Sequence, residues 1–237
     1  DDATDPTVTW SSSDPTIATV DENGTVTAIK AGSVEITAKA GEQTAVCNVT
    51  ITAAQKSAVK DFTDVSEAWY TPYIDYMYNK GLMVGNADGT FGPNTSLSRA
   101  MLAQILYSRA GSPDVEEAQI FTDVPAGKWY TDAVNWAYKA GVVAGMGDGT
   151  FAPGEDVTRQ QLAQMLYAEQ KSPEVTGTLD FPDADDVSGW AVNAVLWVTQ
   201  QGIVSGSDVG GVKYLLPRDS STRAQAATML TLYDQKF

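Results

Sequence analysis

Apolar and polar residues alternate along the first part of the chain in five short segments. The segments are residues 7–10, 17–20, 24–28, 34–38 and 45–51. Turn-forming residues separate them, among them Pro15, Gly24 and Gly41. Period-two alternation rich in Thr and Val is typical of half-buried strands. The pattern predicts a small antiparallel β-sandwich, or part of one.

Two side chains of this block are expected in its core. Ala45, Cys47, Val49 and Ile51 alternate along the last segment and therefore share one face of the predicted strand. We expect Cys47 to be a small buried apolar group rather than a reactive thiol. Trp10 is expected to fill the interior of the sandwich.

The apolar spacing changes to a helical one after residue 61. Apolar side chains three and four positions apart predict one buried stripe on each helix. The first helices carry Trp69, Tyr73, Ile74 and Met77; Trp129, Ala133, Val134 and Ala137; Trp190, Ala194, Val195 and Val198. The second helices carry Leu102, Ile105 and Leu106; Leu162, Met165 and Leu166; Ala226, Met229 and Leu230.

Signals for helix ends flank these stripes. Gly81, Gly141 and Gly202 follow the first helices, where a left-handed residue ends a helix. Ser98, Thr158 and Thr222 precede the second helices, where a hydroxyl can cap the first turn. Each unit therefore reads as helix, glycine-rich loop, helix.

The unit occurs three times. Phe62-Thr63-Asp64-Val65 recurs at 121–124 and, changed, at 181–184, a period of roughly 60 residues. The third copy has a longer, divergent loop at 207–215. A single helix pair cannot bury both stripes, so the three copies are expected to pack together as one helical domain.

Composition excludes several classes of function. The 237 residues have a net charge of −15, the wrong sign for binding nucleic acids or anionic membranes. The chain contains no His and one Cys, which excludes Ser-His-Asp triads, histidine zinc sites and an internal disulfide. We expect no cofactor, no metal and no membrane insertion. The chain has no initiator Met and no targeting signal, so we expect a mature chain or a fragment.

The first block resembles the bacterial Ig-like group 2 (BIG2) domain. The resemblance is carried by Val8-Thr9-Trp10-Ser11-Ser12-Ser13-Asp14-Pro15, by Ala18-Thr19-Val20-Asp21 and by Asn23-Gly24-Thr25-Val26-Thr27-Ala28. It implies a domain at 1–53, followed by a linker at 54–61. Such domains begin with two further strands, so this one is expected to be truncated at its N-terminus, with an exposed sheet edge or a partner strand from elsewhere.

The repeats resemble the S-layer homology (SLH) repeat. The pattern is clearest in Phe121-Thr122-Asp123-Val124, Gly147-Asp148-Gly149-Thr150-Phe151 and Val157-Thr158-Arg159. The implied repeats are 62–113, 121–172 and 181–237. The resemblance implies a pseudo-threefold helical unit on the wall of a Gram-positive bacterium, whose grooves between repeats bind secondary cell-wall polysaccharide, often pyruvylated. It also gives a binding role to Arg99, Arg159 and Arg223.

One position departs from that family. Its Thr-Arg-Ala-Glu motif ends in Glu, which is replaced by Met101, Gln161 and Gln225 here. Glu or Gln three residues after a Ser or Thr cap can bond back to the N–H of the cap. We interpret the Glu mainly as part of the cap, a role that Gln can fill and Met cannot. If the Glu of the family contacts glycan instead, its replacement affects glycan binding in all three grooves.

The candidate binding residues repeat threefold. A cation at the start of a helix is locally unfavourable, so each Arg is expected to meet an anionic partner, either a pyruvyl carboxylate or the Asp of the Phe-x-Asp segment. Each Trp either stacks on sugar or anchors the core, and each Asp either holds a turn or binds sugar hydroxyls. The Asp-Gly-Thr-Phe segments are expected to be plain turns rather than calcium loops. The candidates are Arg99, Arg159, Arg223, Trp69, Trp129, Trp190, Asp64, Asp123 and Asp183.

We therefore expect a non-catalytic wall-anchoring module of a larger surface protein. The groove near Arg223 is expected to be the weakest, because the third repeat diverges. Two alternatives are an anchor to polyamine-modified peptidoglycan and self-association in a surface layer through the exposed sheet edge. A glycosidase using, for example, Asp123 with Glu155 is disfavoured, because a carboxylate set repeated three times is unlike a single active site.

Overall fold

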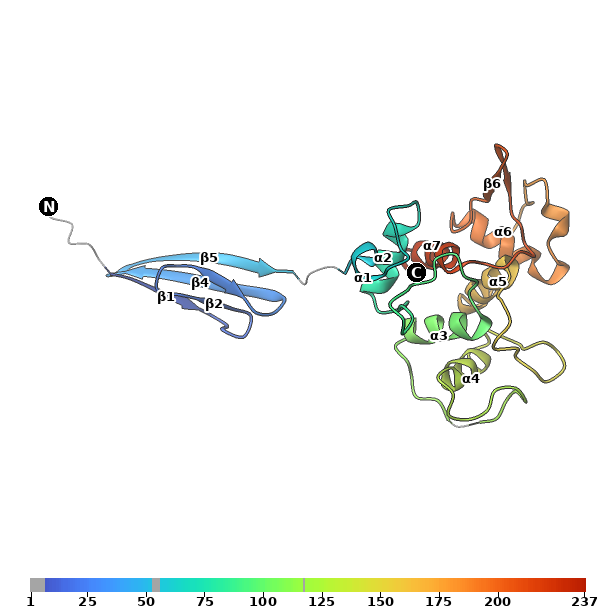
Figure 1. The fold of residues 1–237 in the computed structure, drawn as a ribbon, viewed down its shortest axis with the longest axis horizontal. Helices are drawn as coiled ribbons and strands as arrows, with labels where there is room; N and C mark the ends of the chain where they lie inside the picture. The colour runs from blue at the N-terminus through green and yellow to red at the C-terminus, as the bar shows by residue number, and fades with distance from the viewer. Residues whose placement is uncertain (1–6, 53–55, 117) are drawn as a thin grey trace. The chain divides into compact units, whose positions relative to one another are not determined.

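The computed structural model describes residues 7–52, 56–116 and 118–237, which fall into two compact units (Figure 1). One unit spans Asp1–Gln55 and the other Lys56–Phe237. Each has a hydrophobic core of its own. Among the described helices, none is long and apolar enough to cross a membrane.

The N-terminal unit is an antiparallel β structure, as the alternation predicts. Its strands are β1 (Val8–Ser12), β2 (Ala18–Val20), β3 (Val26–Ala28), β4 (Gly32–Ala40) and β5 (Gln43–Ile51). One sheet has the order β1-β4-β5, and β2 pairs with β3 in a second sheet. Ala18, Val34 and Ile36 form the buried core between them.

This core is smaller than the sequence suggests, and two predictions about it are wrong. Cys47 is exposed. It pairs with the buried Ile36, but the small core contacts β5 at Val49 and Ile51 instead, nearer the end of the strand. Trp10 is 36% exposed. Its ring lies against Gly24, where a Cβ atom would come within 2.6 Å of it, so Trp10 covers the β2–β3 turn instead.

The C-terminal unit consists of three helix–loop–helix repeats (Figure 1). The helix pairs are α2 (Thr71–Asn79) with α3 (Arg99–Arg109), α4 (Thr131–Lys139) with α5 (Arg159–Glu169), and α6 (Val192–Gln200) with α7 (Arg223–Asp234). Two 3-10 turns, η1 (Ala184–Asp186) and η2 (Gly189–Ala191), precede α6. The divergent loop of the third repeat is a hairpin of β6 (Ser207–Val209) and β7 (Val212–Tyr214).

The predicted helix signals are confirmed. Gly81, Gly141 and Gly202 follow the first helices with φ of 70°, 74° and 71°. The hydroxyls of Ser98, Thr158 and Thr222 accept a hydrogen bond from the third residue of the following helix. Gln161 and Gln225 complete capping boxes, whereas α3, with Met101 at this position, has the hydroxyl cap alone.

Part of the predicted linker belongs to the repeats. A short helix, α1 (Ala58–Asp61), packs against α2. The N–H of Ala58 donates to Oδ1 of Asp75 at 2.6 Å, and the Ala58 side chain is fully buried. Residues 54 and 55 of the linker lie outside the described residues.

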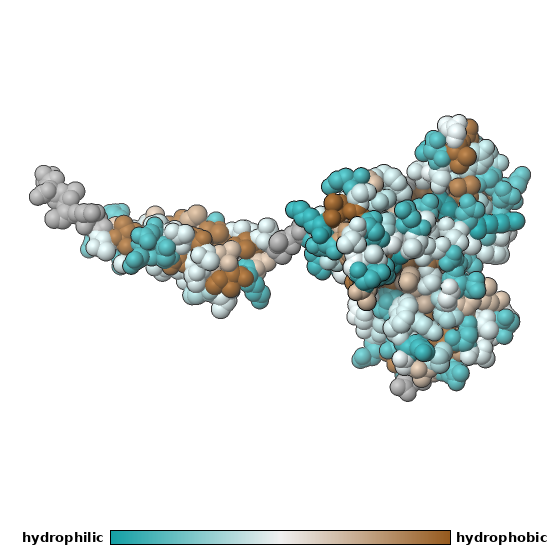
Figure 2. All heavy atoms as spheres, viewed as in Figure 1, coloured by the Kyte–Doolittle hydropathy of each residue, from teal (hydrophilic) through white to brown (hydrophobic). Residues whose placement is uncertain are grey.

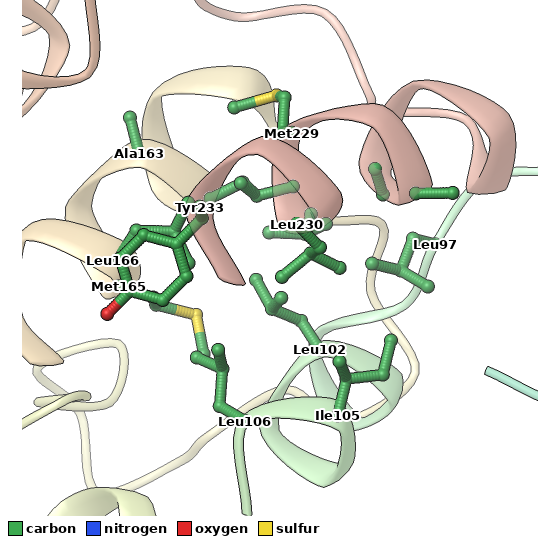
Figure 3. Packing of buried hydrophobic residues seen from close by; sticks show 14 of the residues in the cluster. Leu97, Leu102, Ile105, Leu106, Ala163, Met165, Leu166, Met229, Leu230 and Tyr233 are labelled. Carbon is green, nitrogen blue, oxygen red and sulfur yellow. The ribbon is translucent and has the colours of Figure 1, made fainter. Parts of the chain in front are cut away.

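The second helices meet at the centre of the C-terminal unit. Figure 3 shows side chains of α3, α5 and α7 pointing toward one another, among them Leu102, Leu166 and Leu230. The first helices pack outside them, and each contacts a different repeat: α4 contacts α3, α6 contacts α5, and α2 contacts α7. On the face seen in Figure 2, hydrophobic residues form separate small patches among hydrophilic ones.

The backbone also links the three repeats in a closed cycle. The N–H of Val157 donates to the carbonyl of Leu97, that of Ser221 to Val157, and that of Leu97 to Ser221, each at 2.9 Å. All three residues are fully buried. Every repeat therefore bonds to both of the others just before its second helix.

Side chains at the far ends of the second helices form an ionic cluster. Arg109 of α3 pairs with Glu169 of α5 at 3.1 Å and with Asp234 of α7 at 2.9 Å. Asp234 also accepts hydrogen bonds from Lys80 and Tyr76, both at 2.7 Å. The cluster therefore connects the three repeats at the other end of the core.

Candidate functional site

The three predicted arginines bind the turn of the next repeat. Each is the first residue of its helix, and its Nε donates to a backbone carbonyl. Arg99 bonds to Phe151 at 2.8 Å, Arg159 to Leu215 at 2.7 Å, and Arg223 to Phe91 at 2.8 Å. The guanidinium groups of Arg99 and Arg223 also lie over the rings of Phe151 and Phe91. A backbone carbonyl is thus the partner of Nε in all three, and the aromatic ring is an additional partner in two of them.

The three predicted aspartates hold those same turns. Both carboxylate oxygens of Asp123 accept backbone N–H groups, from Phe151 at 2.8 Å and from Ala152 at 2.7 Å. Asp64 and Asp183 make the equivalent pairs of bonds. The Asp thereby fixes the peptide whose carbonyl receives the Arg of the preceding repeat. The turn interpretation of the aspartates agrees with this geometry.

The alternative of direct Arg–Asp bridges does not hold among the described residues. There, no ion pair joins Arg99, Arg159 or Arg223 to a carboxylate. Burial lowers the pKa of each of these arginines, and nearby carboxylates oppose the shift: Asp123 for Arg99, Asp219 and Asp183 for Arg159, Asp64 for Arg223. The guanidinium group of Arg stays protonated in proteins, so each of the three is treated as a cation.

Each Arg lines a groove between repeats. The first groove has a volume of about 560 Å³ and is formed by Arg99, the loop 141–146, Gln161 and Gln164 of α5, and Trp190. It combines an Arg of the first repeat, a loop and helix of the second, and a Trp of the third. Its loop is mainly aliphatic and includes Val142 and Val143.

The second groove repeats this arrangement one step along. It has a volume of about 600 Å³ and contains Arg159, the loop 203–208, Gln225 and Thr228 of α7, and Trp69. The β6–β7 hairpin adds Lys213 to its lining. The divergent loop of the third repeat therefore lies beside Arg159 and not beside Arg223, which corrects the reason given for a weak Arg223 groove.

The third groove is the smallest, at about 250 Å³. It contains Arg223, the loop 82–86, Met101 and Gln104 of α3, and Trp129. Arg223 makes two further contacts here: Nη2 donates to the Val84 carbonyl at 2.7 Å, and Nη1 lies 3.8 Å from the Met101 sulfur.

The three tryptophans are surface residues. Trp69, Trp129 and Trp190 are 61%, 60% and 56% exposed. They precede α2, α4 and α6 and do not belong to the buried stripes. The prediction that they lie on those stripes is therefore wrong, and so is the alternative that they anchor the core. Each indole lines a groove whose Arg comes from another repeat. An exposed indole beside a charged donor can stack on the apolar face of a sugar ring.

Sequence reasoning missed which residues share a groove. The capping residues Gln161 and Gln225 line the first and second grooves, and Met101 lines the third. The Oε1 atoms of Gln161 and Gln225 accept the N–H of the cap residue, and the same two residues line a groove. A residue at the position of the family's Glu can therefore cap its helix and line a groove at the same time. The only sign of this in the sequence was that the position lies three residues after the cap in all three repeats.

No metal centre is seen in the described ranges, where no group of three His, Cys, Asp or Glu residues is placed to hold an ion. In the Asp-Gly-Thr-Phe turns, Oδ1 of Asp88 accepts both the N–H and the hydroxyl of Thr90, and Asp148 and Thr150 do the same. These carboxylates thus serve the turn.

Comparison with known proteins identifies both units. The pattern of the S-layer homology domain matches residues 61–101, 120–163 and 180–227, and that of the bacterial Ig-like domain (group 2) matches residues 1–51. An S-layer protein of Bacillus licheniformis is 33% identical over 201 residues, 84% of this chain and 22% of that protein.

Enzymes are also among the relatives. An endoglucanase of Bacillus sp. (strain KSM-635) is 30% identical over 182 residues, 74% of this chain and 19% of the enzyme. An amylopullulanase of Thermoanaerobacterium thermosulfurigenes is 28% identical over 176 residues, 72% of this chain and 9% of the enzyme. The chain therefore spans less than a quarter of each of these three relatives, and the enzymes match it through their S-layer homology regions.

Proposed function

Because the chain belongs to the S-layer homology domain family, we propose that it is a non-catalytic module that anchors a larger surface protein to a bacterial cell wall. Its ligand in this proposal is the secondary wall polysaccharide of a Gram-positive bacterium, a pyruvylated and therefore anionic glycan. The grooves between the repeats are the binding sites.

One observation carries this proposal. Each groove combines the Arg of one repeat with an exposed Trp of another, as Arg99 and Trp190 do in the first groove. A guanidinium group can bind a ketal carboxylate through two parallel hydrogen bonds, and an indole can cover a sugar face. Nη1 and Nη2 of Arg99 and Arg159 have no hydrogen-bond partner within the described residues, so they are available to a ligand.

The proposed arrangement of the grooves is pseudo-threefold. It is supported by the contacts α3–α4, α5–α6 and α2–α7 and by the cycle of bonds among Leu97, Val157 and Ser221. Three similar grooves on one unit allow several contacts with one repeating glycan, which raises the overall affinity above that of a single groove.

The charge of the chain sets the expected salt dependence. A net charge of −15 repels an anionic polymer at long range. Affinity then has to come from short-range contacts inside the grooves. Salt screens the repulsion as well as the attraction, so binding is expected to depend on salt less than binding to a basic patch does.

Sedimentation with isolated cell wall tests the proposal. Walls carrying an S-layer protein would be used intact, after chemical removal of pyruvate, and after removal of the whole polysaccharide. The triple variant Trp69→Ala, Trp129→Ala, Trp190→Ala changes one exposed side chain in each groove. Trp10→Ala is the control, because Trp10 lines none of them.

We expect the wild-type chain and Trp10→Ala to sediment with intact wall and the triple variant to remain in solution. Removal of pyruvate should weaken the binding of the wild-type chain without abolishing it. Undiminished binding to wall stripped of polysaccharide would contradict the proposal and would favour peptidoglycan as the ligand. Undiminished binding by a folded triple variant would exclude the grooves.

A further inference from the structure

The three grooves differ in how many cationic N–H groups are free to meet a ligand. In the first groove, Arg99 uses Nε for the Phe151 carbonyl and keeps both Nη groups. In the third, Arg223 uses Nε and Nη2 for carbonyls, and its Nη1 faces the Met101 sulfur. The third groove therefore has the fewest free donors and the smallest volume, about 250 Å³.

The second groove has the most cationic N–H groups that are free to meet a ligand. Arg159 uses Nε for the Leu215 carbonyl and keeps both Nη groups. It is half-buried, whereas Arg99 and Arg223 are buried, and its turn has Leu215 where the other two have Phe. Lys213 adds a second cation, and it makes no ion pair or hydrogen bond through its side chain within the described part of the chain.

Within the repeats, as far as the structure describes them, the hairpin that supplies Lys213 is found in the third copy alone. Lys213 lies on β7, opposite Asp208 on β6. Asp208 also lines the second groove, but its Oδ1 accepts the N–H of Gly211 at 3.1 Å within the hairpin. Gly206 makes room beside Lys213, since a Cβ atom there would come within 3.2 Å of the Lys213 Cβ. The groove thus offers two cations and one carboxylate, a set that suits an acidic sugar with free hydroxyls.

We infer that the second groove is the principal site for the acidic sugar and that Lys213 determines its preference for the carboxylated form. In this inference, which rests on the proposed function, the carboxylate lies between Arg159 and Lys213, and Asp208 accepts a sugar hydroxyl. The first groove binds the same sugar more weakly through Arg99 alone. The third groove contributes least, because Arg223 is an internal contact.

The inference is tested with Lys213→Gln, which removes the charge from an exposed side chain and keeps a polar group of similar length. Lys39→Gln is the matched control: it makes the same change of charge on an exposed residue that lines no groove. The full chain is titrated with solubilised secondary wall polysaccharide, before and after removal of pyruvate. Thermal unfolding verifies that both variants fold.

We expect Lys213→Gln to bind the native polysaccharide about five- to tenfold more weakly than the wild-type chain, as for loss of one charged hydrogen bond at a partly exposed site. After removal of pyruvate, the two should bind within about twofold of each other, because the charge then has no carboxylate to meet. Lys39→Gln should behave as the wild-type chain.

Equal binding of the native polysaccharide by Lys213→Gln and the wild-type chain would overturn the inference and leave the proposed function intact. So would an equal loss for both forms of the polysaccharide, since Lys213 would then have no preference for the carboxylate. If the wild-type chain binds neither form, the proposed function itself fails, and the inference with it.

Discussion

The guanidinium carbon of Arg99 lies 4.7 Å from the centre of the Phe151 ring, and Nε of the same side chain donates to the Phe151 carbonyl at 2.8 Å. An arginine that lines a groove is therefore also a contact between two repeats. Replacing it by Ala would confound loss of binding with loss of structure, so the structural part has to be measured separately.

Arg99→Lys is expected to lower the free energy of unfolding by about 1–2 kcal/mol, because Lys keeps the charge but has neither Nε nor a planar group to lie over the ring. Urea denaturation measures the change. Arg218→Lys is the control: Nε of Arg218 also donates to a carbonyl, that of Asp186, but the side chain is exposed, so its change should be under about 0.5 kcal/mol. Equal losses in both variants would contradict the role assigned to burial.

Asp123→Asn is expected to destabilise the second repeat by about 1–3 kcal/mol. Asp123 accepts two backbone N–H groups, and in Asn an NH₂ group would face one of these donors. Thermal unfolding followed by circular dichroism measures the change. Asp185→Asn, at an exposed position in η1, should leave the unfolding temperature nearly unchanged. A stable Asp123→Asn variant would show that the turn does not depend on the carboxylate.

Met101→Gln is expected to stabilise the chain by about 0.5–1 kcal/mol, because Gln can complete the capping box that α3 lacks. The same change removes the sulfur beside Nη1 of Arg223, so binding to the third groove should increase. The reciprocal variant Gln161→Met should lose a similar amount of stability. Chemical denaturation of both variants measures these changes, and shifts of the same sign would contradict the capping explanation.

Stability is expected to fall in acid partly through Asp234. Burial would raise the pKa of Asp234, but the hydrogen bonds from Lys80, Tyr76 and Arg109 outweigh it and lower that pKa below the usual value. A carboxyl whose folded pKa is lowered stabilises the fold above its unfolded pKa of about 3.9, and this contribution disappears as the pH falls through the folded value.

Asp234→Asn should therefore cost about 1–2 kcal/mol at pH 7 and less at the acid end of the range, where the wild-type group is protonated as well. Urea denaturation across that pH range measures the difference. Glu116→Gln is the control, because its ion pair with Lys139 is exposed and spans 3.6 Å. A deficit for Asp234→Asn that stays constant with pH would contradict the assignment.

Local patterns in the sequence predicted the local structure well. The alternation placed the five strands of the first unit, and the positions of Ser98 and Gly81 placed a helix start and a helix end. These features depend on neighbours in the chain. The exposure of Cys47 and Trp10 depends on how far a second sheet extends, which the period of one strand does not report.

The composition of the grooves could not be predicted for a similar reason. The repeats predicted that Arg99 and Trp190 have equivalents in every copy, but not that these two residues, from the first and third repeats, share one groove. Which residues share a groove depends on how the helices of different repeats pack, for example α4 against α3. That Lys213 lines the second groove could not be predicted either, because it belongs to the divergent loop of the third copy.

The hydrogen-bond cycle through Leu97, Val157 and Ser221 joins the three repeats in a closed ring. An open array can gain or lose a unit at its end, because every internal interface survives the change. A closed ring has no end: deleting one copy would leave a buried donor and a buried acceptor unmatched, and a fourth copy would have no bond to enter. We therefore expect the three repeats to unfold together rather than one after another.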